Sequence, residues 1–234
     1  MPVTEYLIRN AELYPDEVAL VELNPDEKDT RRTTWKEFDL IQPSANMPYR
    51  REITWSVFNE KANRFANMLI SRGVKKGDKV AILMYNCLEW LPIYFGVLKT
   101  GAIAVPFNFR YDSDEIYYCA ELAQVDVIVF GFAFIGRIEV NAERLLRGRL
   151  LIYVGDNCPS FAESYHELVA DCSSKEPDVK ITEDDYGAIY FSSGTTGFPK
   201  AILHKHQSLT QAAVMEQKHL SLIHISEPTR HAQI

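Results

Sequence analysis

Short apolar runs that alternate with helical patterns constrain the fold of this chain more than any other feature. The longest runs are residues 79–85 (KVAILMY), 125–131 (VDVIVFG) and 149–155 (RLLIYVG), and a shorter one, AIAVPF, follows Gly101. Apolar runs of this length are typical of strands covered on both faces, as in parallel sheets. Because the connections are short and helical, the sequence predicts an α/β fold in which a parallel sheet is flanked by helices.

The helical segments have recognisable start and stop signals. Residues 54–72 place one apolar face at helical spacing, composed of Phe58, Ala62, Phe65 and Leu69. Gly73 then offers a C-terminal stop. Ser113 is expected to cap a further helix, because Asp114 and Glu115 occupy its first turn, where negative charge is favourable. Other helical patterns cover residues 88–100, 135–146 and 161–172.

A polar, acidic stretch divides the chain. Residues 171–187 (DCSSKEPDVKITEDDYG) lack a strand pattern and are interpreted as a linker into a second sheet, whose first strand is residues 188–191 (AIYF). We therefore divide the chain into an N-terminal α/β subdomain (1–178), a linker with the start of a second α/β subdomain (179–219), and a tail (220–234).

Composition argues against several classes of protein. The 234 residues carry a net charge of −7 and no long basic run, which disfavours a nucleic-acid partner. The four cysteines are widely spaced and form no Cys/His cluster with zinc spacing, so buried, reduced thiols and no metal site are expected.

Neither a signal peptide nor a membrane span is predicted. Glu5 and Arg9 lie where a signal peptide would have an apolar run. Residues 90–109 are apolar but are interrupted by Pro92, Lys99, Gly101 and Pro106. A helix followed by a turn and a strand accounts for these interruptions better than a membrane helix does. We therefore expect a soluble, cytoplasmic protein.

The stretch YFSSGTTGFPK, residues 190–200, is the strongest indication of function. Phosphate oxygens need donors that converge without crowding, and Gly194 and Gly197 allow backbone N–H groups to approach closely. Short hydroxyl donors are supplied by Ser192, Ser193, Thr195 and Thr196. Lys200 adds a positive charge suited to a polyphosphate, and Pro199 limits the flexibility of the loop's exit. Together these residues suit a loop that closes over a nucleotide triphosphate.

Three other interpretations of this stretch compete. A glycine-rich turn with hydroxyls is, on composition alone, more often a plain surface turn. A Walker-type P-loop needs Gly-Lys followed by Ser or Thr, whereas two residues separate Gly197 from Lys200, and Ala201 follows. A dinucleotide-binding turn is disfavoured because no G-x-G-x-x-G follows the early strands.

The wider stretch YFSSGTTGFPKAILHKH closely resembles the phosphate-loop signature of the adenylate-forming, or AMP-binding, superfamily. This group includes acyl-CoA synthetases, firefly-type luciferases and the adenylation domains of peptide synthetases. Residues 53–116, from ITWSVF to YDSDEI, also resemble the amino-terminal region of acyl-CoA synthetases, and the resemblance extends to about His219. One residue departs from the family pattern, because Ala201 stands where glycine is usual.

The resemblance implies the truncated, N-terminal part of the large domain of an acid–thiol ligase. Such an enzyme joins a carboxylate to the AMP of ATP, releases pyrophosphate, and then forms a thioester with coenzyme A. The expected cofactors are ATP, Mg²⁺ and coenzyme A, and the expected substrate is a fatty or other carboxylic acid. By family analogy, the β- and γ-phosphates of ATP are held by Ser192, Ser193, Gly194, Thr195, Thr196, Gly197 and Lys200. His204 and His206 follow on the next strand, where a structural role is expected for both.

The end of the chain has a second resemblance. Residues 220–230 (LSLIHISEPTR) match, codon by codon, the translation of a transposon-end adapter used in DNA library preparation, so residues 220–234 are interpreted as a non-native tail. The family sequence is then expected to end near His219, within a helix that begins about Ser208. The remaining family motifs would be absent, so no catalytic residue is assigned and this chain by itself is expected to be inactive.

Other functions remain open at this point. The chain could instead derive from an adenylation domain of a peptide synthetase or from an acyl-carrier ligase. A noncatalytic module that retains the fold is a further alternative of a different class. A P-loop phosphotransferase is disfavoured by the missing Gly-Lys-Ser/Thr.

Overall fold

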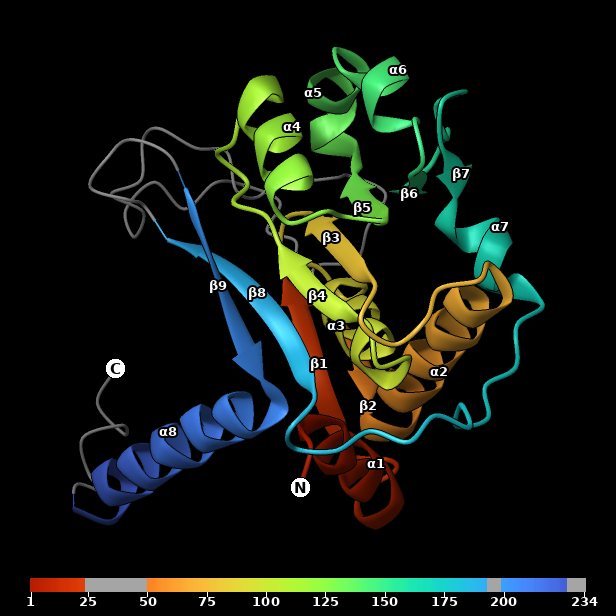
Figure 1. Ribbon diagram of the computed structural model, residues 1–234. Helices are drawn as coiled ribbons and strands as arrows, with labels where there is room; N and C mark the ends of the chain where they lie inside the picture. Colours follow the sequence, from red (N-terminus) through yellow and green to blue (C-terminus); the bar gives the residue numbers. More distant parts are fainter. Residues whose placement is uncertain (24–49, 193–198, 227–234) are drawn as a thin grey trace, which may run out of the picture.

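The computed structural model of this chain describes residues 1–23, 50–192 and 199–226 (Figure 1). Its helices are α1 (Val3–Leu13), α2 (Trp55–Ser71), α3 (Trp90–Lys99), α4 (Ser113–Leu122), the 3-10 helix η1 (Phe132–Phe134), α5 (Ile135–Glu139), α6 (Ala142–Leu145), α7 (Tyr165–Ala170) and α8 (His206–Ser226). Its strands are β1 (Val18–Leu23), β2 (Arg50–Thr54), β3 (Lys79–Leu83), β4 (Ile103–Pro106), β5 (Val127–Gly131), β6 (Leu150–Val154), β7 (Glu163–Ser164), β8 (Tyr186–Ser192) and β9 (Lys200–Lys205).

The sheet predicted from the sequence is confirmed. Its strand order is β7–β6–β5–β3–β4–β8–β9, and neighbouring strands are parallel except β8 and β9, which form an antiparallel hairpin. β1 and β2 form a separate antiparallel pair. Because parallel strands share one direction, the carboxyl ends of β3, β4, β5, β6 and β8 lie at the same edge of the sheet.

Helices cover both faces of this sheet (Figure 1). On β3, Val80 and Ile82 face the core that the sheet forms with α2, α3 and α7. Ala81 and Leu83 face the second core, which includes α4, η1 and α5. Successive side chains of a strand point to opposite faces, so a strand between two cores must be apolar throughout. This explains why the apolar runs of the sequence located the strands so well.

The longest predicted helix before the linker, α2, follows its sequence pattern. The Oγ1 atom of Thr54 accepts a hydrogen bond from the backbone N–H of Val57 at 3.4 Å and caps the helix. All four residues of the expected apolar face are buried. The chain turns after the helix at Gly73, whose φ of +86° is disfavoured for residues with a side chain.

Three local predictions are corrected. The N-cap of α4 is Asp112 rather than Ser113: its Oδ1 accepts from the backbone N–H groups of Asp114 and Glu115, and the Glu115 side chain accepts from the backbone N–H of Asp112. Asp112 is the residue with extended backbone angles, whereas Ser113 is already the first helical residue. The pattern over residues 135–146 is divided between α5 and α6, and residues 161–172 contain the short strand β7 as well as α7.

The expectation of a second sheet beginning at residues 188–191 is wrong for the described residues. β8 joins the first sheet as the neighbour of β4, with Ala188 paired to Ala104. Its Ile189 and Phe191 pack against the core on the α4 side, so apolar burial favours this placement. Likewise α8 begins at His206, slightly earlier than expected. The division of the chain into subdomains stays a prediction.

The part of the linker before β8, residues 171–185, contains no helix or strand. It forms hydrogen bonds and an ion pair with side chains of α2 and α3. Backbone carbonyl groups of residues 170–175 accept hydrogen bonds from the side chains of Asn63, Arg64 and Asn67. Lys99 of α3 is 2% exposed, and its Nζ is 2.6 Å from Glu176 Oε2. The same Nζ donates to the side-chain oxygens of Asn59 and Asn63, each at 2.7 Å. The linker is therefore part of the packed structure.

All four cysteines are free thiols. Within the described ranges, no helix combines the length and the apolar character needed to cross a bilayer. The same ranges contain no cluster of three or more His, Cys, Asp or Glu residues suited to a metal ion.

Candidate functional site

The predicted phosphate-binding residues belong to the β8–β9 hairpin. Ser192 is the last residue of β8, Lys200 is the first residue of β9, and the two are paired across the ladder. The other predicted site residues, Ser193, Gly194, Thr195, Thr196 and Gly197, lie outside the described residues. The structure therefore brings together the two ends of the predicted loop, and the rest of the loop stays a prediction.

The two described site residues lie on one face of the hairpin. Directly opposed residues of an antiparallel pair share a face, with Cβ atoms about 5 Å apart. The pairs that share the face of Ser192 and Lys200 are Tyr190 with Ile202 and Ala188 with His204. Ser192 is half-buried and Lys200 is exposed, so a hydroxyl and an ammonium group stand side by side where β8 ends.

Aromatic contacts hold β8 from both faces just before the loop. On one face, the ring of Phe191 packs edge-on against Phe107 (5.8 Å between centroids) and Tyr111 (6.4 Å). On the other face, the hydroxyl of Tyr190 is 2.8 Å from the hydroxyl of Tyr94 on α3. These contacts join the start of the loop to the β4–α4 connection on one face and to α3 on the other. Sequence reasoning missed Tyr94 and Phe107, because no local pattern links them to residues so far along the chain.

The loop begins at the edge where substrates of parallel α/β proteins usually bind. β8 is parallel to β4, so Ser192 lies at the carboxyl edge of the sheet, next to the segment that follows β4. Open α/β sheets bind ligands outside this edge, where the connecting loops can approach a small molecule. The position of the hairpin thus agrees with a ligand-binding role for its loop.

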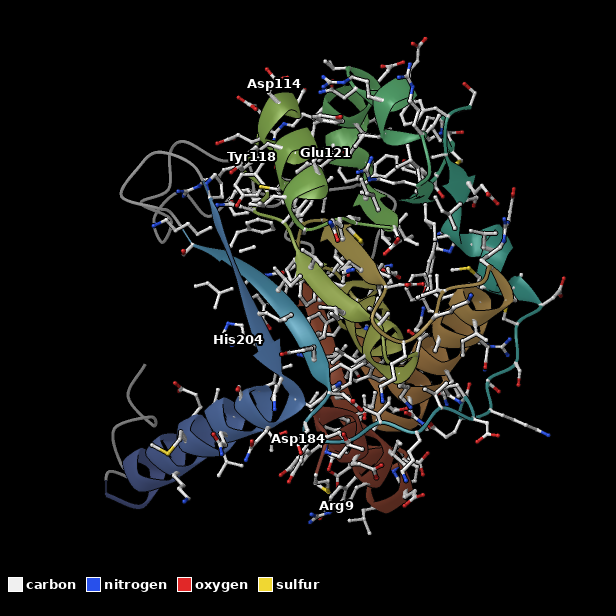
Figure 2. All side chains as sticks on the ribbon, in the orientation of Figure 1. Arg9, Asp114, Tyr118, Glu121, Asp184 and His204 are labelled. Carbon is white, nitrogen blue, oxygen red and sulfur yellow. The ribbon has the colours of Figure 1, made fainter. Side chains whose placement is uncertain are left out.

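The two histidines occupy different elements, which corrects the expectation that both follow on the next strand. His204 lies on β9 (Figure 2). The centroid of its ring is 5.2 Å from that of Tyr190. His206 is the first residue of α8 and is fully buried; within the described residues neither of its ring nitrogens has a hydrogen-bond partner. Burial lowers the pKa of His206, while Asp185 opposes the effect and Lys76 adds to it. A buried, neutral ring fits the structural role expected for this residue.

Gly187 explains how this ring is accommodated. A Cβ atom at position 187 would lie 3.3 Å from Cδ2 and Nε2 of His206, and 3.2 Å from a methyl group of Leu209. The absence of a side chain lets α8 pack closely against β8. The hairpin and the following helix are therefore joined by direct packing at their base.

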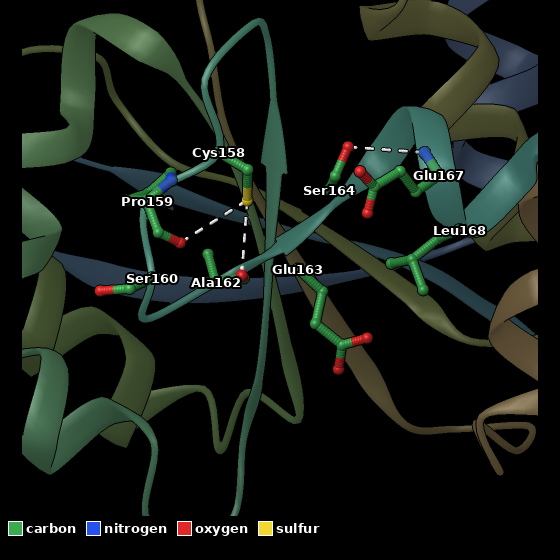
Figure 3. Close-up of a pocket in the computed structure, with 8 residues that line it drawn as sticks. All are labelled: Cys158, Pro159, Ser160, Ala162, Glu163, Ser164, Glu167 and Leu168. Atoms are coloured by element: carbon green, nitrogen blue, oxygen red, sulfur yellow. Dashed lines mark hydrogen bonds between the residues drawn. The ribbon is translucent and has the colours of Figure 1, made fainter.

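A cavity far from the hairpin has no part in this site. It has a volume of about 400 Å³ and lies between the β6–β7 connection and α7, at the opposite end of the sheet from β9 (Figure 3). Its Cys158 thiol donates to the carbonyl of Ala162 at 3.4 Å. Burial raises the pKa of Cys158, and the carboxylates of Glu167 and Glu163 add to the effect. A raised pKa favours the protonated thiol over the more nucleophilic thiolate.

A larger cavity, of about 670 Å³, lies at the carboxyl end of β3. The cavity is lined mostly by apolar side chains, which come from β1, the β3–α3 connection and the start of α3. They include Leu20, Met84, Leu88 and Trp90. Its carboxylate, Glu22, accepts from the backbone N–H of Leu88 at 2.9 Å and from Arg51 at 2.7 Å. The charge of Glu22 is thus already compensated, and burial raises the pKa of the Cys87 thiol that also lines the cavity to about 12.

The sequence of this chain is similar to known ligases. A family profile described as AMP-binding enzyme matches residues 7–227. A long-chain-fatty-acid–CoA ligase, FadD13 of Mycobacterium tuberculosis, is 32% identical over 174 residues, which cover 74% of this chain and 33% of the relative. A 3-hydroxybenzoate–CoA/4-hydroxybenzoate–CoA ligase of Thauera aromatica is 30% identical over 185 residues, covering 78% of this chain and 35% of the relative. The chain thus spans about a third of the length of these relatives.

Solved structures agree with this similarity. The anthranilate CoA ligase AuaEII in complex with anthranoyl-AMP matches with a TM-score of 0.73 and 25% identity, over 88% of this chain and 35% of that one. The N-terminal domain of FACL13 from Mycobacterium tuberculosis matches with a TM-score of 0.65 and 25% identity, over 89% and 45% of the respective chains. The profile, the relatives and the shared fold together establish that this chain belongs to the AMP-binding enzyme family, the adenylate-forming superfamily that its sequence resembles.

Proposed function

We propose that this chain is the N-terminal part of an ATP-dependent acyl-CoA ligase. In the proposed reaction, a carboxylate oxygen attacks the α-phosphorus of ATP, forming acyl-AMP and releasing pyrophosphate. The thiol of coenzyme A then attacks the acyl carbon, and AMP leaves as the thioester forms. The observation that supports this most directly is the pairing of Ser192 with Lys200 at the two ends of a glycine- and hydroxyl-rich loop.

In this proposal the hairpin binds the triphosphate of ATP. Lys200 supplies a positive charge, and Ser192 supplies a hydroxyl donor on the same face. Glycines at positions 194 and 197 would let backbone N–H groups reach the β- and γ-phosphate oxygens. Because phosphoryl and nucleotidyl transfer depend mainly on positioning and on compensation of charge, such a loop contributes by holding pyrophosphate in line as a leaving group.

Magnesium enters this proposal with the ATP substrate. The described residues offer no cluster of carboxylates for a resident metal ion, so no step is assigned to one. The relatives named above carry coenzyme A and a carboxylic acid in their descriptions, which favours coenzyme A over a carrier protein as the thiol. The proposed substrate class is therefore a carboxylic acid.

A charge-removal experiment tests the nucleotide site. Replacing Lys200 by alanine should weaken ATP binding to the chain about tenfold or more, because a charged hydrogen bond contributes about 1.5–3 kcal/mol. Binding is measured by titration calorimetry in the presence of Mg²⁺. Lys205→Ala is the matched control, since it removes the same charge farther along β9, where Lys205 pairs with Asp184. Equal affinity of Lys200→Ala and Lys205→Ala, or no ATP binding by the parent chain, would contradict the proposal.

We also propose that this chain does not complete the reaction by itself. The matched part of this chain covers only about a third of these relatives, so most of their residues have no counterpart here. Carboxylate-dependent exchange of pyrophosphate into ATP should remain at background across a panel of fatty and aromatic acids. Robust exchange would refute this part of the proposal while leaving the nucleotide site intact.

The subdomain division and the non-native tail stay proposals as well. A variant that ends at His219 should unfold at the same urea midpoint as the whole chain if residues 220–234 are foreign to the fold. A lower midpoint would instead assign these residues a stabilising role, since α8 continues to Ser226.

A further inference from the structure

The carboxyl half of β8 is held in place chiefly by side chains. Its ladder with β4 has a single recorded residue pair, Ala104 with Ala188, although β8 continues to Ser192. β9 pairs with β8 along its whole length but is itself the last strand of the sheet among the described residues. β4 itself ends at Pro106, two residues after Ala104, so pairing with β4 does not reach Ser192, and other contacts must set the position of the hairpin's tip.

Tyr94 provides a fixed point close to this part of the strand. It lies in the middle of α3 and is 8% exposed, and its ring stacks on Trp90 at 5.4 Å between centroids with an interplanar angle of 12°. α3 is itself tightly packed, because a Cβ atom on its Gly96 would lie only 2.8 Å from the carbonyl oxygen of Ala62 on α2. The Tyr94 hydroxyl thus projects from a helix that has little freedom to move.

This hydroxyl reaches the residue that precedes the candidate site. It lies 2.8 Å from the hydroxyl of Tyr190. Tyr190 and Ser192 are separated by one residue on a strand, so both point to the same face and lie about 7 Å apart along it. Lys200 stands opposite Ser192 on that face. A displacement of Tyr190 would therefore also displace Ser192 and Lys200, the two described residues of the candidate site.

The hydrogen bond between the two tyrosine hydroxyls does more than fill space in the core. A phenylalanine at position 94 would supply the same ring, without the cost of burying a polar group. Two tyrosines that meet through their hydroxyls instead define one distance and one direction, because a hydrogen bond is short and directional. Phe191, on the opposite face, packs on Phe107 and limits movement the other way.

We propose that Tyr94 is a positioning residue of the nucleotide site, and that its hydrogen bond with Tyr190 sets the place of Ser192 and Lys200 for the triphosphate of ATP. The inference rests on the proposed function, and it assigns a role in that site to a helix that does not itself contact the loop's ends. Tyr94 acts through Tyr190 and does not touch the ligand.

Conservative tyrosine-to-phenylalanine variants of the chain test this role. Tyr94→Phe and Tyr190→Phe should each weaken binding of ATP, or of inorganic tripolyphosphate, about threefold to tenfold, as expected for the loss of one net hydrogen bond. The double variant should lose no more than either single variant, because both remove the same bond.

A matched control distinguishes positioning from general loss of stability. The buried Tyr153 hydroxyl donates to the carbonyl of Asp156 at 2.8 Å, on β6 and away from the hairpin. Tyr153→Phe should lower stability but leave ligand affinity unchanged. Equal affinity losses in Tyr94→Phe and Tyr153→Phe, or additive losses in the double variant, would overturn the proposal.

Hydrogen exchange of the ligand-free chain separates this proposal from the proposed function. Backbone amides of β8 and β9 should exchange faster in Tyr94→Phe than in Tyr153→Phe at equal global stability. Unchanged exchange in Tyr94→Phe would refute the positioning role of the Tyr94–Tyr190 hydrogen bond, even if ATP binds. Faster exchange in Tyr94→Phe, together with no affinity of the parent chain for ATP, would instead refute the nucleotide site, and with it the assigned role in binding.

Discussion

Replacing Glu176 by alanine should destabilise the chain by about 2 kcal/mol. The carboxylate of Glu176 accepts three hydrogen bonds, from Lys99 Nζ (2.6 Å), Asn59 Nδ2 (2.6 Å) and Asn63 Nδ2 (2.9 Å). Its loss leaves the Lys99 ammonium group buried with only the two asparagine oxygens as acceptors. The linker would also lose its contact with α2 and α3 at this point.

The magnitude follows from the unequal burial of the pair. Removing one partner of a fully buried ion pair costs about 3–5 kcal/mol, because the remaining charge is not compensated. Here Lys99 is 2% exposed but the Glu176 side chain is 41% exposed. Water can therefore reach the vacated site and reduce the loss to about 1–3 kcal/mol.

Urea unfolding followed by far-ultraviolet circular dichroism measures this loss. The midpoint should fall in Glu176→Ala without a change in the slope of the transition. Glu60→Ala is the matched control, since Glu60 is an exposed glutamate on α2; it should change stability by less than about 0.5 kcal/mol. Lys99→Met should also destabilise the chain, because it leaves the buried Asn63 without its Lys99 partner.

The double variant Lys99→Met/Glu176→Ala decides whether the two residues act together. Its destabilisation should be at least about 1 kcal/mol smaller than the sum of the single effects, as expected for residues in direct contact. Strict additivity would show that the ion pair contributes no coupling, and the reasoning from burial would then be wrong.

Four further outcomes are expected. Burial raises the pKa of Glu176, but hydrogen bonds from Lys99 and the asparagines outweigh this effect and bring the pKa below its usual 4.5. The parent chain should therefore be more stable than Glu176→Gln above about pH 4.5, and this advantage should fade as the pH falls. Urea midpoints at a series of pH values measure the difference. Because burial lowers the pKa of His206, the contribution of this residue to stability should be complete above about pH 6.5 and lost as the pH falls. His206→Leu should flatten this part of the stability profile. Asp112→Ala should cost about 1 kcal/mol through loss of the capping box, with a smaller loss in Ser113→Ala. Gly96→Ala should lower the thermal midpoint because its Cβ would meet the Ala62 carbonyl oxygen, whereas Gly136→Ala, with open space around it, should not.

Elements with a strong local pattern could be predicted from the sequence. The runs at residues 79–85, 125–131 and 149–155 became β3, β5 and β6, because a strand between two cores must be apolar at every position. The apolar face of α2 was equally clear, since helical spacing alone places its four residues together. Where two neighbouring residues were both suitable, as with Asp112 and Ser113, local sequence did not distinguish the cap.

Predictions failed where the outcome depended on residues far apart in the chain. The apolar strand β8 was recognised, but its neighbour was not, because pairing with β4 depends on which sheet edge the linker brings within reach. The burial of Lys99 could not be anticipated either. Its partners come from α2 and from Glu176, a glutamate in a stretch that looks like an ordinary polar linker.

The amino-acid sequence alone predicted the fold class and the alternation of helices and strands from α2 to β6, and the chemistry of the candidate loop stays a prediction from sequence. These properties depend on spacing and composition over short distances, where hydrophobic periodicity and backbone preferences act directly. The tertiary structure alone decided the edge of the sheet at which β8 lies and the tyrosine pair that holds it to α3. Tyr94 and Tyr190 are 96 residues apart, so only the packing of helices against the completed sheet could bring their hydroxyls together.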